Sequence, residues 1–133
     1  MSPDLANLFA ELPSTPRREE QFRVLLDRPG LRIERIVSTG QASPPDFWYD
    51  QPQGEWVLLL QGEATLEIAG EALPRRLRPG DFVHLPPRMK HRVAGTAPDQ
   101  ATIWLAIHYD ETCPPGQSHE RSYQAEELSP IGV

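Results

Sequence analysis

Proline and glycine divide this chain into short segments, and this division limits its fold more than any other feature. Fifteen prolines and nine glycines account for 24 of its 133 residues. Proline interrupts helices and glycine favours turns, so long helices are excluded. Between these breaks, apolar residues mostly alternate with polar ones, as they do in strands with one buried face. The sequence therefore predicts an all-β domain of short strands joined by tight turns.

About nine strands are predicted, over residues 21–26, 31–37, 46–50, 55–60, 64–69, 72–77, 81–85, 91–96 and 102–108. Regularly spaced short strands of this kind are typical of a β-sandwich or barrel. Ahead of them, residues 3–12 predict a short amphipathic helix that begins after a capping segment and ends at Pro13. Its apolar residues recur at helical spacing: Leu5, Leu8, Phe9 and Leu12. We expect this helix to lie across the barrel exterior or against a partner subunit.

The length of 133 residues fits a single domain. We predict an N-terminal helix and linker over residues 1–20, a barrel over 21–109, and a C-terminal tail over 110–133. The polar, proline- and glycine-containing tail is expected to be extended or disordered. Cys113 lies in it as the only cysteine. It cannot form an intramolecular disulfide, which favours a reducing, cytoplasmic compartment.

Charge and hydropathy exclude two classes of partner. The net charge of −6 argues against nucleic acid, whose binding depends largely on lysine and arginine. The longest apolar run, Trp56 to Leu60, is far shorter than the roughly 20 residues of a membrane span. Six of the thirteen basic residues fall within 75–92; they either form a rim that attracts an anionic small molecule or are simply solvated. The expected partner is a small molecule.

Two stretches carry most of the functional information. The first runs from Asp50 to Glu55 and is followed by Gly62, and the second runs from Gly80 to Pro86 and is followed by His91. Their spacing indicates strand, turn and strand, which would bring two carboxylates and an imidazole to the mouth of a barrel. Carboxylate and neutral imidazole are common ligands of divalent metal ions.

These stretches resemble the paired motifs of the cupin superfamily, whose members are small jelly-roll barrels built as a double-stranded β-helix. The first motif is G, five residues, H-x-H, three or four residues, E, six residues, G; Glu55 and Gly62 match its second half. The second is G, five residues, P-x-G, two residues, H, three residues, N; Gly80, Pro86 and His91 match it. The resemblance covers about residues 47–95 and extends to small uncharacterised bacterial single-domain cupins. It implies a cupin barrel and a homodimer.

The chain departs from the cupin motifs at several positions. Counting back from Glu55 places the two histidines of the first motif on Trp48 and Asp50, while Arg88 and Gly95 replace the glycine and asparagine of the second. Trp48 cannot ligate a metal because its indole N–H only donates. The resemblance therefore implies metal donors from Asp50, Glu55 and His91, with a fourth from His84, His108, Gln51 or Gln53.

The resemblance implies a mononuclear zinc, manganese, iron or nickel site that binds or transforms a small polar molecule. An enzyme of this kind would be an isomerase, a lyase or a dioxygenase. The alternative is a metal-free, non-catalytic binding or sensing barrel, in which Trp48 closes the pocket and the polar residues form a hydrogen-bonded cluster. His108 shares a strand face with Trp104 and Ala106. It either points to the barrel mouth or ends its strand at the surface.

Overall fold

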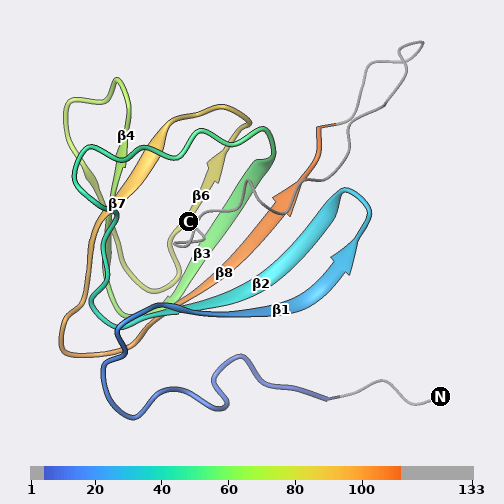
Figure 1. Ribbon diagram of the computed structural model, residues 1–133, viewed down its shortest axis with the longest axis vertical. Coiled ribbons are helices and arrows are strands. Elements are labelled where there is room, and N and C mark those ends of the chain that lie inside the picture. The colour runs from blue at the N-terminus through green and yellow to red at the C-terminus, as the bar shows by residue number, and fades with distance from the viewer. Residues whose placement is uncertain (1–4, 112–133) are drawn as a thin grey trace.

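The computed structural model describes residues 5–111, which form two antiparallel β-sheets that enclose a core (Figure 1). One sheet has five strands in the order β1-β2-β8-β3-β6, and the other has three in the order β5-β4-β7. The eight strands are β1 (Gln21–Arg28), β2 (Leu31–Ser38), β3 (Gly54–Gln61), β4 (Ala64–Ile68), β5 (Arg75–Leu77), β6 (Phe82–Leu85), β7 (His91–Thr96) and β8 (Thr102–Tyr109). The all-β prediction is confirmed, and the arrangement fits a jelly roll.

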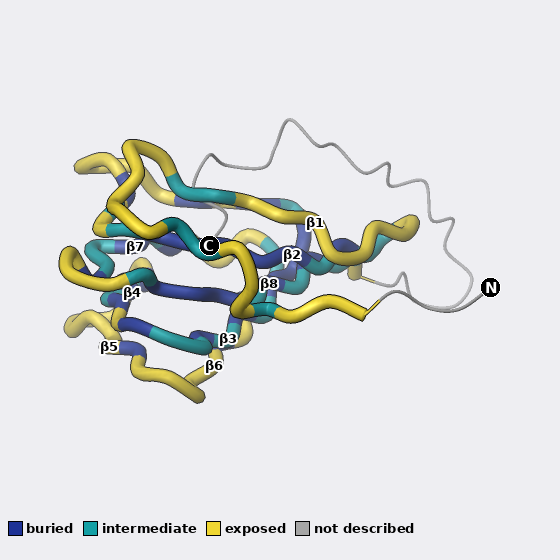
Figure 2. The backbone as a smooth tube through the Cα atoms, turned by 90° about the horizontal axis from the view of Figure 1, so that it is seen from below, coloured by how far each residue is buried: buried dark blue, intermediate teal, exposed yellow. Residues whose placement is uncertain are grey.

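Alternate residues of both sheets meet in one hydrophobic core. Ile36 on β2, Val57 on β3 and Trp104 on β8 face Leu66 on β4 and Val93 on β7, and each is 1% exposed or less. In Figure 2 most of the buried stretches lie on strands, while β1 and most of the connecting loops are exposed. Within residues 5–111, no helix is long and apolar enough to cross a membrane.

Two of the predicted strands differ from the structure: one is absent and one is shorter. Residues 46–50 form no strand; they make only an isolated bridge between Tyr49 and His91. Asp46, with φ of 63°, has a left-handed conformation that no strand accommodates, and prolines flank the segment on both sides. The predicted strand over 72–77 is reduced to β5 because Pro74 cannot donate to the ladder.

The described part of the predicted N-terminal helix, from residue 5 onward, is not helical. The Asn7 side chain accepts the backbone N–H of Phe9, and Glu11 has φ of 55°, so the local hydrogen bonding and backbone are those of turns. The Arg35 guanidinium on β2 donates to the carbonyls of Leu8 and Ala10. The segment therefore lies on the outer face of the five-stranded sheet through backbone contacts, and tertiary bonding has replaced the helix that the periodicity predicted.

A buried carboxylate holds the end of this N-terminal segment to the barrel. Glu20 is hydrogen-bonded to the Ser38 hydroxyl, whose oxygen also accepts the indole N–H of Trp104 at 3.0 Å. Burial raises the pKa of Glu20 to about 7, and the Ser38 hydrogen bond offsets this only in part. The protonated, neutral carboxyl is therefore the form that the fold favours.

The stability of the protein is expected to fall as pH rises from about 4.5 to about 7 through this group. The folded state keeps the Glu20 proton over that range while the unfolded state releases it, so unfolding becomes easier with each pH step. The full effect is on the order of 3 kcal/mol. We expect Glu20→Gln to unfold at higher urea concentration than the wild type at pH 8 and at a similar concentration at pH 4.5. An unchanged difference between the two proteins across this range would contradict the prediction.

Candidate functional site

Buried polar side chains gather at one end of the barrel interior. Cross-strand register places Arg32 at the start of β2 beside His108 at the end of β8, and His108 beside Glu55 at the start of β3. His91 begins β7 on the opposite sheet. The buried polar residues of this region are Arg32, Glu34, Gln51, Gln53, Glu55, His91 and His108. The apolar core lies farther along the same strands, at Ile36, Val57 and Trp104.

In the segment just before β3, side chains alternate between the interior and the surface. From Tyr49 to Glu55 every odd-numbered residue is buried, whereas Trp48 and Asp50 are exposed. Residues on the same face of an extended chain are an even number of positions apart, and Asp50 is five positions before Glu55. The three-residue spacing of the first cupin motif therefore applies here. It assigns the two histidine positions to Tyr49 and Gln51, and the alignment to Trp48 and Asp50 is one residue out of phase.

Three of the predicted site residues lie outside this polar end. The Asp50 carboxylate is 3.7 Å from the Arg88 guanidinium at the surface. Trp48 lines a surface hollow together with residues 67–74 of the β4–β5 connection. His84 is exposed on β6, where its Nε2 is hydrogen-bonded to the Tyr109 hydroxyl.

Glu55 and His91 meet in the interior. Glu55 Oε1 lies 3.7 Å from His91 Nε2, and both side chains are at most 3% exposed. His91 Nδ1 is 2.9 Å from the Met89 carbonyl, which can only accept, so this nitrogen carries a proton and Nε2 is the atom turned to Glu55. Tyr49 stacks on the His91 ring at 5.4 Å. These contacts fix the imidazole against the carboxylate.

Burial raises the pKa of Glu55 to about 7. The nearby His108 lowers it in part, Glu34 raises it and Arg32 lowers it. Neither carboxylate oxygen has a hydrogen-bond partner within the described residues. A buried carboxyl with a pKa near neutrality and no hydrogen bond to either oxygen can accept and return a proton, and its oxygens could accept hydrogen bonds from the hydroxyl groups of a bound molecule.

Two further charged residues of the site were missed by the sequence analysis. His108 Nε2 is 3.1 Å from Glu34 Oε1, and the same oxygen lies 3.4 Å from the Arg32 guanidinium; all three side chains are at least nine-tenths buried. Arg32 and Glu34 lie on the inner face of β2 together with Ile36, because every second residue of a strand faces the same way. This two-residue periodicity was the sequence signal that could have identified them. Charged residues are usually exposed, which hides such positions in a sequence.

The residues at the polar end do not fit the predicted metal site. Residues 5–111 contain no group of three His, Cys, Asp or Glu side chains placed to hold a metal ion. Glu55 and His91 supply two donors, but Asp50 points outward and His108 is bonded to Glu34. Tyr49 and Gln51, which occupy the histidine positions of the motif, are weaker ligands than imidazole for transition metals.

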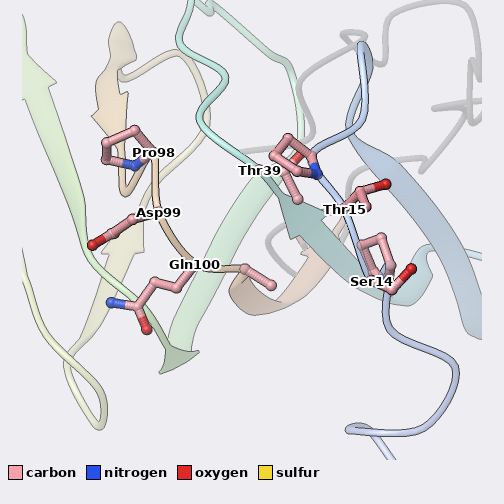
Figure 3. A pocket seen from close by; sticks show the side chains of 9 residues that line it. Ser14, Thr15, Thr39, Pro98, Asp99 and Gln100 are labelled. Atoms are coloured by element: carbon pink, nitrogen blue, oxygen red, sulfur yellow. The ribbon is translucent and has the colours of Figure 1, made fainter.

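A separate hollow of about 150 Å³ lies near the opposite end of the barrel (Figure 3). Its walls are residues 13–16 of the N-terminal segment, Thr39, and the β7–β8 loop over 98–101. The figure shows small hydroxyl, amide and proline groups around it, with Asp99 at its margin. It includes none of the predicted site residues.

The described residues form a jelly-roll barrel with buried polar and charged side chains at one end of its interior. A model of the cupin domain matches residues 34–108, more than half of the chain, and the chain belongs to the cupin family. It is similar to a Ralstonia eutropha protein provisionally named a mannose-6-phosphate isomerase, at 51% identity over 82% of this chain and 100% of that one, with a TM-score of 0.79.

Two more distant structures share the fold. A cupin superfamily protein of Desulfitobacterium hafniense is 16% identical over 84% of this chain and 95% of that one, with a TM-score of 0.65. The polyketide cyclase RemF of Streptomyces resistomycificus is 18% identical over 86% of this chain and 83% of that one, with a TM-score of 0.62. At these identities the similarity establishes the jelly-roll fold alone.

Proposed function

We propose that this cupin binds a small polyhydroxylated carbonyl compound at the polar end of its barrel and moves a proton between adjacent carbons of it. The observation that carries the proposal is Glu55, a fully buried carboxyl with a pKa near 7 and two oxygens without partners in the described chain, held beside His91. The provisional name of the Ralstonia relative supports a sugar phosphate as the substrate class.

The chemistry follows from the two groups. In its ionised form Glu55 removes the proton from the carbon next to the substrate carbonyl, and the resulting enediol takes a proton back at the neighbouring carbon. His91 faces the same space through Nε2 and exchanges protons with the substrate oxygens. The net change is an aldose–ketose isomerisation, which needs no oxidant, reductant or second substrate. Because the surrounding core excludes water, the interactions of Glu55 and of His91 with the substrate are both strengthened.

Proton NMR in D₂O tests this function. Incubation with mannose 6-phosphate or fructose 6-phosphate is expected to interconvert the two sugars and to introduce deuterium at the carbon next to the carbonyl. Neither conversion nor deuterium incorporation with these sugar phosphates and their unphosphorylated forms would overturn the proposal.

Metal binding, expected from the family motif, stays a prediction. Removing metal ions tests whether the proposed reaction depends on one. Because the described donors do not form a metal site, activity is expected to survive treatment with a chelator and to be independent of added zinc, manganese, iron or nickel. Loss of activity on chelation, recovered with one of these ions, would contradict a metal-free reaction. Elemental analysis of protein purified without an affinity metal gives the stoichiometry.

We also propose a homodimer, with a second copy covering β1. Within residues 5–111 this strand is an edge strand that pairs with β2 alone, and it exposes apolar side chains on both faces: Phe22, Val24, Leu25 and Leu26. An exposed apolar edge favours pairing with another chain. Sedimentation is expected to give a dimer that Val24→Lys converts to a monomer. Phe82→Lys, at the opposite edge of the sheet, is the control; equal effects of both variants would contradict the assignment.

The cytoplasmic location suggested by the single cysteine stays a prediction.

A further inference from the structure

The second imidazole of the polar end is held by a partner of a different kind from the first. His91 donates through Nδ1 to a backbone carbonyl, whereas His108 contacts the Glu34 carboxylate through Nε2. The two rings are therefore held through opposite nitrogens, His91 through Nδ1 and His108 through Nε2. His108 stands directly across the β3–β8 ladder from Glu55, at the distance of a cross-strand pair.

The contact with Glu34 determines which ring nitrogen of His108 carries a proton. Glu34 Oε1 is within 3.4 Å of the Arg32 guanidinium as well as 3.1 Å from His108 Nε2. A carboxylate oxygen can only accept, so Nε2 of His108 carries the proton that is donated to Glu34, while Arg32 supplies a positive charge beside the same oxygen. A neutral imidazole that donates through Nε2 has its lone pair on Nδ1. In the described chain His108 Nδ1 is buried and accepts no hydrogen bond.

We propose that Glu34 is a positioning residue that holds His108 in the Nε2–H form, so that Nδ1 serves as a second proton acceptor of the site opposite His91. Glu55 then has the His91 imidazole 3.7 Å away and His108 as its cross-strand neighbour, and the tautomers of the two rings are fixed by different partners. In the isomerisation proposed above, on which this role of His108 rests, Glu55 transfers the carbon-bound proton. His108 Nδ1 accepts a hydroxyl proton of the substrate and returns it to the oxygen that becomes the new hydroxyl group.

The tautomer of His108 is measurable without any substrate. Long-range proton–nitrogen correlation spectra of uniformly ¹⁵N-labelled protein distinguish Nδ1–H from Nε2–H imidazole. We expect His108 to show a protonated Nε2 and a bare Nδ1 at pH 8, with His91 showing the reverse. Assignment uses His108→Gln and His91→Gln. A bare Nε2 on His108, or protons on both of its nitrogens, would overturn the proposal.

Variants at Glu34 test the positioning role. Glu34→Gln keeps a carbonyl acceptor for His108, whereas Glu34→Leu removes it at similar size. We expect the His108 signal of Glu34→Gln to remain in the Nε2–H form and that of Glu34→Leu to divide between both forms. The kcat for sugar phosphate isomerisation should fall at least tenfold in Glu34→Leu with KM nearly unchanged, and recover to within threefold of wild type in Glu34→Gln.

The two readouts separate the proposals. An inactive wild-type protein with the expected His108 tautomer would refute the isomerase function and leave the Glu34 assignment standing. An active wild-type protein in which Glu34→Leu leaves both tautomer and kcat unchanged would refute the positioning role alone. If Glu34→Leu fails to fold because Arg32 loses its carboxylate, the wild-type spectrum and Glu34→Gln still decide the question.

Discussion

Glu55→Gln is expected to reduce isomerase activity by about 10²- to 10⁴-fold, the range that a positioned acid–base group contributes. Glutamine keeps the shape of the side chain and its ability to accept a hydrogen bond, but it cannot take up a proton. Because burial raises the pKa of Glu55 to about 7, the fold favours the neutral form, and the neutral amide should be accommodated at least as well. We therefore expect the variant to be as stable as the wild type, or more stable, at pH 8.

This combination of effects distinguishes a functional carboxylate from a structural one. Turnover of the sugar phosphate and urea unfolding at pH 8 are measured on the same preparations. Glu63→Gln is the matched control, because that carboxylate is more than half exposed and pairs with Arg76 at the surface. Loss of stability in Glu55→Gln with little loss of activity would show that Glu55 serves the fold and not the reaction.

Gly62→Ala is expected to destabilise the protein by about 3 kcal/mol, enough to leave a small domain marginally folded. Gly62 follows β3 with φ of 92°, which alone costs an L-residue about 1–2 kcal/mol. A Cβ atom at this position would also lie 2.3 Å from the Thr102 hydroxyl oxygen and 2.7 Å from the Thr102 Cα. The Cα belongs to the start of β8 and cannot move without disturbing the ladder between β2 and β8.

Gly70→Ala separates the two contributions to this cost. Gly70 has nearly the same backbone conformation, with φ of 89°, but in the described part of the chain no atom other than those of Gly70 and its two chain neighbours lies within 4 Å of the added Cβ. Its substitution should therefore cost only the backbone term. Urea denaturation of both variants measures the difference, which we expect to be at least 1 kcal/mol. Equal destabilisation would mean that Thr102 moves aside freely and that the contact with β8 is unimportant.

The Gly62 contact also gives a physical reason for a glycine at the end of the first cupin motif. The chain turns immediately after β3 with its backbone against Thr102, whose hydroxyl hydrogen-bonds to the main chain of Glu63. Only a residue without Cβ fits this approach in that conformation. A motif position recognised from spacing alone thus corresponds to a close contact between two strands that are forty residues apart in the sequence.

Local chemistry was sufficient to predict the fold class. The spacing of proline and glycine excluded long helices, and the alternation of apolar residues located most of the strands, because both depend on the backbone conformation of a few neighbouring residues. The predicted N-terminal helix was wrong: the segment has turn geometry, and Arg35 donates to its carbonyls at Leu8 and Ala10. That contact joins residues more than twenty positions apart and has no local sequence signal.

For the site, the sequence by itself determined that Glu55 and His91 belong to paired cupin motifs. Only the tertiary structure decided which neighbours join them. It turned Trp48 and Asp50 outward and Tyr49 and Gln51 inward, and it brought Arg32 and Glu34 to His108 across the five-stranded sheet. The physical reason is that a strand offers two opposite faces, so a shift of one residue exchanges every inward side chain for an outward one.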